Sequence, residues 1–302
     1  MRPVLRPGCT LLRRDPTHLQ VGIEPGRAVV LRDSPRLRQV VARLDGVRDD
    51  RDVVADVVEV MGEPRATRRL LEALTAAGVV VDAEPVRTAP APAEVAHQLA
   101  RAEHPATAAA RADDRARSRV KVDGAGSLAD TVAELLTGSG VGSVLTTPDP
   151  GPSQQGAARP DAVVLVGGAA PGARADRLVT AGVPHLPVAV VDGTAVLGPF
   201  VLPGRTGCLR CVDAARTARD PSWPALAAQL SPAPPDPPGM PIPRSPVLEN
   251  ALGAWCVREV LAHLSRGQVL TYGASLRFDD DLVEQVRHSW PLHPRCGCAL
   301  LS

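Results

Sequence analysis

The sequence predicts an α/β protein with two folded parts joined by a linker. Residues 1–84 begin with short apolar runs separated by turn signals, and three amphipathic helical patterns follow. From residue 118 to 302, apolar strands alternate with helices, which is typical of a parallel, doubly wound sheet. The runs that predict strands are "RVKVDGAG", "VGSVLT", "DAVVLVGG", "HLPVAVVDG" and "TAVLGPFVL". The runs that predict helices are "SLADTVAELLTGSG", "ARADRLVTAG" and "VLENALGAWCVREVLAHLSRG". Residues 85–117 are rich in Ala, Pro and Arg with little apolar periodicity, so we expect a linker there, helical in part.

The first part has the element order of a winged helix-turn-helix. The runs "TLLRRDP", "HLQVGIE" and "AVVL" predict three strands in a meander, because Asp-Pro and Pro-Gly turn signals separate them. Helical patterns follow at 33–46, 51–61 and 64–78, each with a cap, a proline or a glycine near one end. The short run "VVVD" then predicts a last strand or wing. We therefore expect a compact winged-helix-like unit.

The second part opens with a glycine loop in a nucleotide-binding context. Gly124 and Gly126 follow the strand "RVKVD" and precede the helix "SLADTVAELL". Ala129 stands where a third glycine is usual, and the acidic residue nearest the end of the next strand, Asp149, comes a few residues late. The loop alone leaves two readings open, a nucleotide site and an empty strand–helix turn.

Four of the six cysteines form two close pairs, Cys208-x2-Cys211 and Cys296-x-Cys298. No apolar stretch typical of a signal peptide or a membrane span occurs, so we expect a cytoplasmic protein whose thiols stay reduced. Clustered cysteines in that compartment favour a metal over disulfides, and four thiolates favour a closed, structural zinc site. Unpaired thiols or a redox pair are the alternatives.

Charge disfavours nucleic acid as a partner. The formal net charge is +1, and residues 1–84 carry 14 arginines against 13 acidic residues. Phosphate binding requires a clear excess of positive charge. A DNA-binding regulator that uses the winged-helix-like unit is thus a third-ranked hypothesis, and we expect no nucleic-acid partner.

The motifs "GPFVLPGRTGCLRC" and "WPLHPRCGC" resemble a known family over residues 118–302. They are similar to the ThiF-like, ubiquitin-activating-type domain of TOMM precursor leader-peptide-binding proteins, the partners of YcaO cyclodehydratases. The resemblance implies a Rossmann-like domain with zinc on the paired cysteines, and a homodimer. The unit at 1–84 is similar in pattern to the leader-recognition element of such proteins.

Active ThiF-like enzymes also carry phosphate and magnesium contacts that this chain lacks. The segments "PDPGPSQQGAARP" and "VVLVGGAAPG" stand where those contacts are expected, and the only lysine, Lys121, lies within the first strand of the sheet. The resemblance with these departures implies an adaptor of ribosomal peptide (RiPP) biosynthesis. It would bind a precursor's leader and present it to a YcaO-type cyclodehydratase for azole formation. The alternative is a ThiF-type adenylyltransferase that binds ATP at Gly124 and Gly126 and activates a carboxylate.

A leader peptide would add as an extra strand beside the run "AVVL". The residues expected to border it there are Ala28, Val29, Val30 and Leu31. The third helix would supply an apolar pocket with Leu71, while Arg68 and Arg69 would meet acidic leader residues. The plain alternative for each arginine is a solvated helix face.

Overall fold

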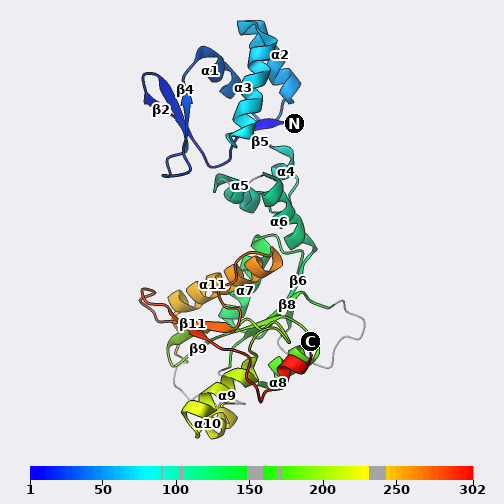
Figure 1. The fold of residues 1–302 in the computed structure, drawn as a ribbon, viewed down its shortest axis with the longest axis vertical. Helices are drawn as coiled ribbons and strands as arrows, with labels where there is room; N and C mark the ends of the chain where they lie inside the picture. Colours follow the sequence, from blue (N-terminus) through cyan, green and yellow to red (C-terminus); the bar gives the residue numbers. More distant parts are fainter. Residues whose placement is uncertain (90, 102–104, 148–158, 169–171, 231–242, 302) are drawn as a thin grey trace. The chain divides into compact units, whose positions relative to one another are not determined.

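A computed structural model describes residues 1–89, 91–101, 105–147, 159–168, 172–230 and 243–301. The chain forms two compact units, Met1–Asp113 and Asp114–Ser302 (Figure 1). No helix among the described residues is both long and apolar enough to cross a bilayer.

The N-terminal unit contains two small antiparallel sheets. The strands β2 (Leu11–Asp15), β3 (His18–Val21) and β4 (Val29–Arg32) pair in the order β2-β3-β4, at the three positions expected from the sequence. The last predicted strand, β5 (Val80–Asp82), pairs with β1 (Pro3–Leu5). Sequence analysis missed β1, because three residues at the start of a chain carry no periodicity of their own.

Three helices cover the three-stranded sheet. They are α1 (Pro35–Val41), α2 (Asp50–Met61) and α3 (Pro64–Ala76). Ser34 and Asp49 accept hydrogen bonds from first-turn N–H groups of α1 and α2, which satisfies donors that a helix start leaves unpaired. The buried cluster between helices and sheet consists of Leu19, Val21, Leu37, Val40, Leu44, Val54, Val57, Leu71, Leu74, Val79 and Val80. Strands and helices occur in the expected order, and the winged-helix assignment stays a prediction.

The region 85–117 contains helices. These are α4 (Glu84–Arg87), α5 (Pro92–Ala100) and α6 (Pro105–Arg117). Val95 and Leu99 of α5 are buried with Val81 and Ala108 in a cluster of their own. Burial of this kind distinguishes the segment from a solvated coil, and the boundary between the two units falls within α6.

A seven-stranded mixed sheet forms the centre of the C-terminal unit, in the order β12-β11-β10-β9-β8-β6-β7. Its strands are β6 (Arg119–Asp123), β7 (Ser143–Thr147), β8 (Ala162–Val166), β9 (His185–Val191), β10 (Thr194–Leu197), β11 (Ala274–Phe278) and β12 (Val286–Ser289). The expectation of a parallel sheet is right for β6 to β9 and wrong for β10 to β12, which pair antiparallel.

A tight turn explains the change of direction. Only Asp192 and Gly193 separate β9 from β10, and both have positive φ angles, 50° and 76°. A two-residue turn of this kind makes a hairpin, whereas a parallel connection needs a crossover of a dozen residues or more.

Helices cover both faces of this sheet (Figure 1). The helices α7 (Ser127–Gly138) and α11 (Pro246–Leu264) pack together on one face. The other face carries α8 (Gly172–Thr180), α9 (Leu209–Arg219) and α10 (Trp223–Gln229). Sequence analysis predicted α7, α8 and α11 and missed α9 and α10. The main core lies between the sheet and the two helices α7 and α11. It includes Phe200, Leu136, Leu186, Leu248 and Leu252.

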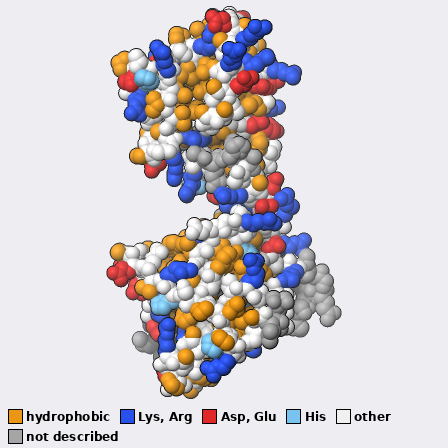
Figure 2. Space-filling view, in the orientation of Figure 1, with side chains coloured by type: hydrophobic (Ala, Val, Ile, Leu, Met, Phe, Trp, Pro, Cys, Tyr) orange, Lys and Arg blue, Asp and Glu red, His pale blue; other side chains and the backbone are white. Residues whose placement is uncertain are grey.

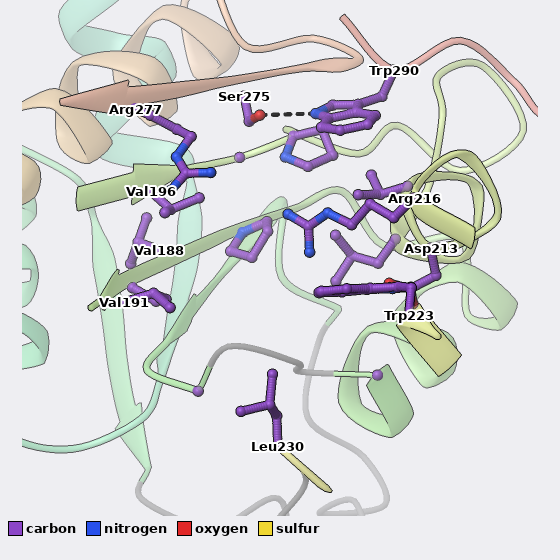
Figure 3. Close-up of a pocket in the computed structure, with 18 of the residues that line it drawn as sticks. Val188, Val191, Val196, Asp213, Arg216, Trp223, Leu230, Ser275, Arg277 and Trp290 are labelled. Atoms are coloured by element: carbon purple, nitrogen blue, oxygen red, sulfur yellow. Dashed lines mark hydrogen bonds between the residues drawn. The ribbon is translucent and has the colours of Figure 1, made fainter. Parts of the chain in front are cut away.

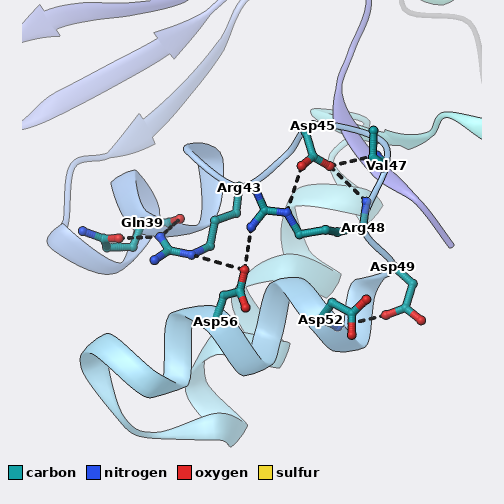
Figure 4. A network of polar contacts seen from close by, with 8 residues as sticks. All are labelled: Gln39, Arg43, Asp45, Val47, Arg48, Asp49, Asp52 and Asp56. Carbon is teal, nitrogen blue, oxygen red and sulfur yellow. Dashed lines mark hydrogen bonds and ion pairs between the residues drawn. The ribbon is translucent and has the colours of Figure 1, made fainter.

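A charged network fixes the turn between α1 and α2 (Figure 4). The Asp45 carboxylate accepts hydrogen bonds from the backbone N–H groups of Val47 and Arg48, at 2.8 and 3.0 Å. The Arg48 guanidinium contacts Asp45 at 2.9 Å and reaches Asp56 of α2 at 2.5 Å. The hydrogen bonds from the Arg48 and Val47 backbone lower the pKa of Asp45 to about 2.

This network predicts a pH dependence of stability. The pKa of Asp45 is about 2 when folded against a usual 3.8, so its stabilising effect is complete above pH 3.8 and is lost as the pH falls through 2. We expect Asp45→Asn to lower the melting temperature at pH 6, with the gap to wild type closing as the pH approaches 2. Thermal unfolding followed by circular dichroism measures this. The exposed Asp52→Asn is the control, and a gap independent of pH would contradict the prediction.

Candidate functional site

The four paired cysteines converge in the C-terminal unit. Their sulfur atoms all lie within 4.8 Å of one another. The Sγ of Cys208 is 3.8 Å from that of Cys211 and 3.5 Å from that of Cys296, and Cys211 is 3.5 Å from Cys298. Cys208 caps the N-terminus of α9 and Cys211 lies in its first turn, so the CxxC spacing directs both sulfurs to one side.

These distances fit a tetrahedral metal ion. Four thiolates at about 2.3 Å from a zinc ion would lie about 3.8 Å from each other, whereas a disulfide requires about 2.05 Å. Burial raises the pKa of Cys208, and that of Cys298 to about 11, whereas at Cys211 burial is outweighed by backbone hydrogen bonds, the largest from His293, which lower the pKa of Cys211. A bound cation would favour the thiolate form of Cys208 and Cys298 at neutral pH. The cluster could hold a metal ion, and four protein ligands would leave no open coordination position.

Glycine permits the close approach of the two cysteine segments. A Cβ atom at Gly207 would collide with the carbonyl oxygens of Trp290 and Pro291. Gly297, between the last two cysteines, has a φ of 72°, which disfavours other residues. The backbone N–H of His293 also donates to the Sγ of Cys211 at 3.3 Å. The C-terminal segment thus folds directly onto the start of α9.

The glycine loop has a structural explanation at its first position. A Cβ at Gly124 would lie 2.8 Å from the Cβ of Val166, so this glycine is required by the contact between the ends of β6 and β8. Gly126 has open space around it and precedes α7 with a φ of 91°. Asp149, the candidate ribose ligand, lies outside the described residues.

Arg174 lies beside the strand end that leads into this loop. Arg174 of α8 donates to the carbonyl oxygens of Asp123 and Gly167, at 3.2 and 3.3 Å, and lies 3.7 Å from the Asp123 carboxylate. Its guanidinium therefore bridges the carboxyl ends of β6 and β8, the edge at which doubly wound sheets bind nucleotides.

A second group lies at the first turn of α7. The Ser127 hydroxyl donates to the Glu249 carboxylate, and Arg244 donates to both residues, with 2.9 Å between Arg244 Nη2 and Glu249 Oε2. The hydrogen bond from Arg244 lowers the pKa of Glu249, so a negative charge stands beside the helix N-terminus. Sequence analysis missed Arg174, Arg244 and Glu249, because each is far along the chain from the loop and belongs to no motif.

In the N-terminal unit, the candidate peptide-binding residues lie on β4 and α3. Ala28 precedes β4, in which Val29 and Leu31 are half-buried. Val30 is 47% exposed. On α3, Arg68 and Arg69 are exposed, whereas Leu71 is buried in the core, and the half-buried Leu70 packs against that core. Hydrophobic side chains gather at the centre of this unit in Figure 2, in the region where Figure 1 places β4 and α3.

The outer edge of β4 has unpaired backbone groups. The Asp33 N–H bonds to the Thr17 carbonyl at 2.8 Å, and His18 stands opposite Arg32. Because antiparallel pairs alternate, odd-numbered residues of β4 bond to β3 and the N–H groups of Val30 and Arg32 point outward. Among the described residues, no backbone group pairs with this edge.

Comparison with known proteins gives fold relatives. No family model and no curated protein matches the chain. A heterocyclase solved in complex with substrate and cofactor is similar with a TM-score of 0.66 and 18% identity, covering 98% of this chain and 39% of the heterocyclase. The heterocyclase TruD is similar with a TM-score of 0.66 and 16% identity, and the match covers 98% of this chain and 42% of TruD. E. coli MccB gives a TM-score of 0.58 in its structure with succinimide and 0.56 in its structure with ATP, both at 14% identity. Each match covers 98% of this chain and 99% of MccB.

These identities establish the fold alone. The chain spans about two fifths of the length of the two heterocyclases and nearly all of MccB. Both units lie within the matched region, since it covers 98% of the chain. The chain therefore has the fold that these heterocyclases contain and that MccB adopts over its whole length.

Proposed function

We propose that this chain is an adaptor that binds the leader of a ribosomally made precursor peptide and presents it to a YcaO-type cyclodehydratase for azole formation. The observation that carries the proposal is the open edge of β4, in a chain whose two units both match the fold of heterocyclases. The matched part is about two fifths of those proteins, so the reaction itself is assigned to a separate partner. A cytoplasmic homodimer remains part of the same expectation.

Backbone pairing would provide most of the affinity for the leader. A peptide strand added beside β4 would bond to the outward groups of Val30 and Arg32 without disturbing the β3–β4 ladder. Alternate peptide side chains would then face the half-buried Val29, Leu31 and Leu70. Arg68 and Arg69 would add modest attraction for acidic leader residues. Leu71 is buried, so we assign it to support of this surface rather than to direct contact.

We also propose that the glycine loop of the C-terminal unit does not support ATP chemistry. Adenylation needs positive charge and a magnesium ligand arranged around a triphosphate. Here Arg174 is engaged with backbone carbonyls, and Arg244 is paired with Glu249. The cysteine cluster would hold a structural zinc ion that anchors the C-terminal segment to α9, with no role in a reaction step.

A ThiF-type adenylyltransferase is the second candidate. MccB, which shares the fold, has been solved with ATP. The start of α7 is open at Gly126, and the buried Oδ1 of Asp123 accepts no hydrogen bond among the described residues. These features favour a ligand near the loop, so the two candidates must be separated by experiment. DNA binding receives no comparable support, because the positive and negative charges of residues 1–84 nearly balance.

The first prediction concerns the edge of β4. Val30→Pro removes one outward N–H group and leaves the bonds from β4 to β3, so leader affinity should fall about tenfold or more. Fluorescence anisotropy with a panel of labelled synthetic leader peptides from ribosomally made precursor peptides measures it. Val30→Ala, which keeps the N–H, is the matched control and should bind within about threefold of wild type. Unchanged binding by the proline variant would refute strand addition at this edge.

A second prediction concerns ATP. Calorimetric titration with Mg·ATP and a pyrophosphate-exchange assay should give no signal with the wild-type chain, because Arg174 and Arg244 are already engaged with groups of the chain itself. The sample is the metal-loaded, full-length protein. Exchange by wild type that Gly126→Asp abolishes would instead establish the adenylyltransferase, since an added carboxylate at the start of α7 repels phosphate.

A third prediction concerns the metal. Elemental analysis should find one zinc ion per chain in wild type and none in Cys211→Ser, while Cys9→Ser, outside the cluster, keeps it. Removal of the ion should lower the melting temperature by about 10 °C, which corresponds to a few kcal/mol. Zinc occupancy should fall as the pH is lowered, because protons compete for the thiolates. Absence of bound zinc, or a melting temperature that a chelator leaves unchanged, would contradict the assignment.

A further inference from the structure

A cavity of about 470 Å³ lies on the α9 face of the C-terminal sheet. It is bounded by β9, β10 and β11 on one side and by α9 and α10 on the other (Figure 3). Its apolar lining comes from Pro187, Val188, Val196, Leu209 and Val212. This volume and lining are typical of a small-molecule site.

Two guanidinium groups point into this cavity (Figure 3). Arg216 of α9 lies over the indole rings of Trp223 and Trp290, at 4.5 and 5.8 Å from their centroids. Arg277 enters from β11. Within the described part of the chain, neither side chain makes a hydrogen bond or an ion pair.

In this arrangement neither guanidinium is paired directly with a carboxylate among the described residues, although Asp213 acts on Arg216 from nearby. Burial lowers the pKa of Arg216, and so does Arg277, while Asp213 raises it. Asp213 accepts a hydrogen bond from Trp223 Nε1 at 2.9 Å, so its carboxylate is held by the indole instead of by a guanidinium. The ring faces offset part of the cost of burying Arg216, yet two neighbouring cations in a concave site still favour an anion between them.

We propose that this cavity binds a monocarboxylate with an apolar body. The carboxylate would lie between Arg216 and Arg277, which offer the planar donor pairs that match it. The body would pack on the valine floor and the tryptophan rings.

The charge of the whole lining selects this ligand over a phosphate. Three arginines border the cavity, Arg216, Arg219 and Arg277, and so do three aspartates, Asp192, Asp213 and Asp220. The local charge therefore balances, and a multiply charged phosphate ester would meet more repulsion than a single carboxylate. Trp290 forms one wall of the cavity. Its Nε1 donates a hydrogen bond to the buried Ser275 hydroxyl at 2.8 Å, so this wall is in place before a ligand binds.

The inference goes beyond the leader-peptide proposal and does not depend on it, because every residue involved belongs to the C-terminal unit. The carboxylate could be a free organic acid or the C-terminus of a peptide, and both share the recognition chemistry above. The test therefore includes a probe of each kind.

Tryptophan fluorescence provides the readout. The chain has three tryptophans, two of which line the cavity, and Trp255→Phe removes the third, which packs against the core on the other face. Full-length, metal-loaded protein with this background is titrated with hexanoate and hexanamide, and with N-acetyl-Val-Leu as the free acid and the amide. We expect saturable binding of at least one acid and binding about tenfold weaker or more for its amide. Hexanoate identifies a free acid as the preferred source, and the dipeptide acid identifies a peptide terminus.

Matched variants test the assigned residues. Arg277→Gln should lower the affinity for the acid about tenfold, and Arg277→Lys should lower it less. Arg177 is an exposed arginine of α8 outside the cavity, so Arg177→Gln should leave the affinity unchanged. Arg277 is exposed on its strand, so its replacement leaves the core unchanged. Equal binding of acid and amide, absence of binding by all four probes, or wild-type affinity in Arg277→Gln would each overturn the proposal.

Discussion

The convergence of four cysteine sulfurs is the constraint on which the C-terminal unit depends. It joins the start of α9 to a segment 84 residues further along the chain. That contact brings Trp290 against Gly207 and close to Arg216, so the same junction forms one wall of the cavity on this face of the sheet. Loss of the junction would free both the C-terminal segment and the N-terminus of α9. The cysteines thus act on the cavity through packing, although none of them lines it.

Each of the two units carries one of the proposed ligand sites. The N-terminal unit offers backbone groups on an open strand edge, which can bind an extended peptide with little dependence on its sequence. The C-terminal unit offers a partly open cavity with an apolar floor and charged side chains at its border, which suits a small group of defined shape. Within the C-terminal unit, the glycine at position 124 lets the ends of β6 and β8 meet closely, and Arg174 lies across the carboxyl ends of these two strands. An inherited fold can keep its backbone while its ligand contacts are replaced.

Polar groups in this chain are largely committed to structure. Arg48 joins two carboxylates at the turn between α1 and α2, and the buried Glu259 accepts hydrogen bonds from the N–H and hydroxyl of Thr271. Against this background, Arg216 and Arg277 differ, because neither guanidinium makes a hydrogen bond or an ion pair among the described residues, and Arg216 lies over two indole rings. Such an arrangement has a cost in the free protein that a bound anion would recover.

The sequence by itself determined the local features. Periodicity and caps predicted α1, α2, α3, α7 and α11, and short apolar runs predicted β2 to β4 and β6 to β10, since these depend on residues close together in the chain. The spacing within each cysteine pair is local in the same way, whereas the meeting of the two pairs was predicted from the ligand chemistry of four clustered thiols.

Only the tertiary structure decided what depends on distant residues. It determined the antiparallel direction of β10 to β12, the pairing of β1 with β5, and the burial of Leu71 in the core. It also brought Arg174 to the ends of β6 and β8, and Arg277 to within range of Arg216. No local pattern encodes these contacts, because each results from the packing of whole elements, and packing depends on the shape and charge of all their side chains together.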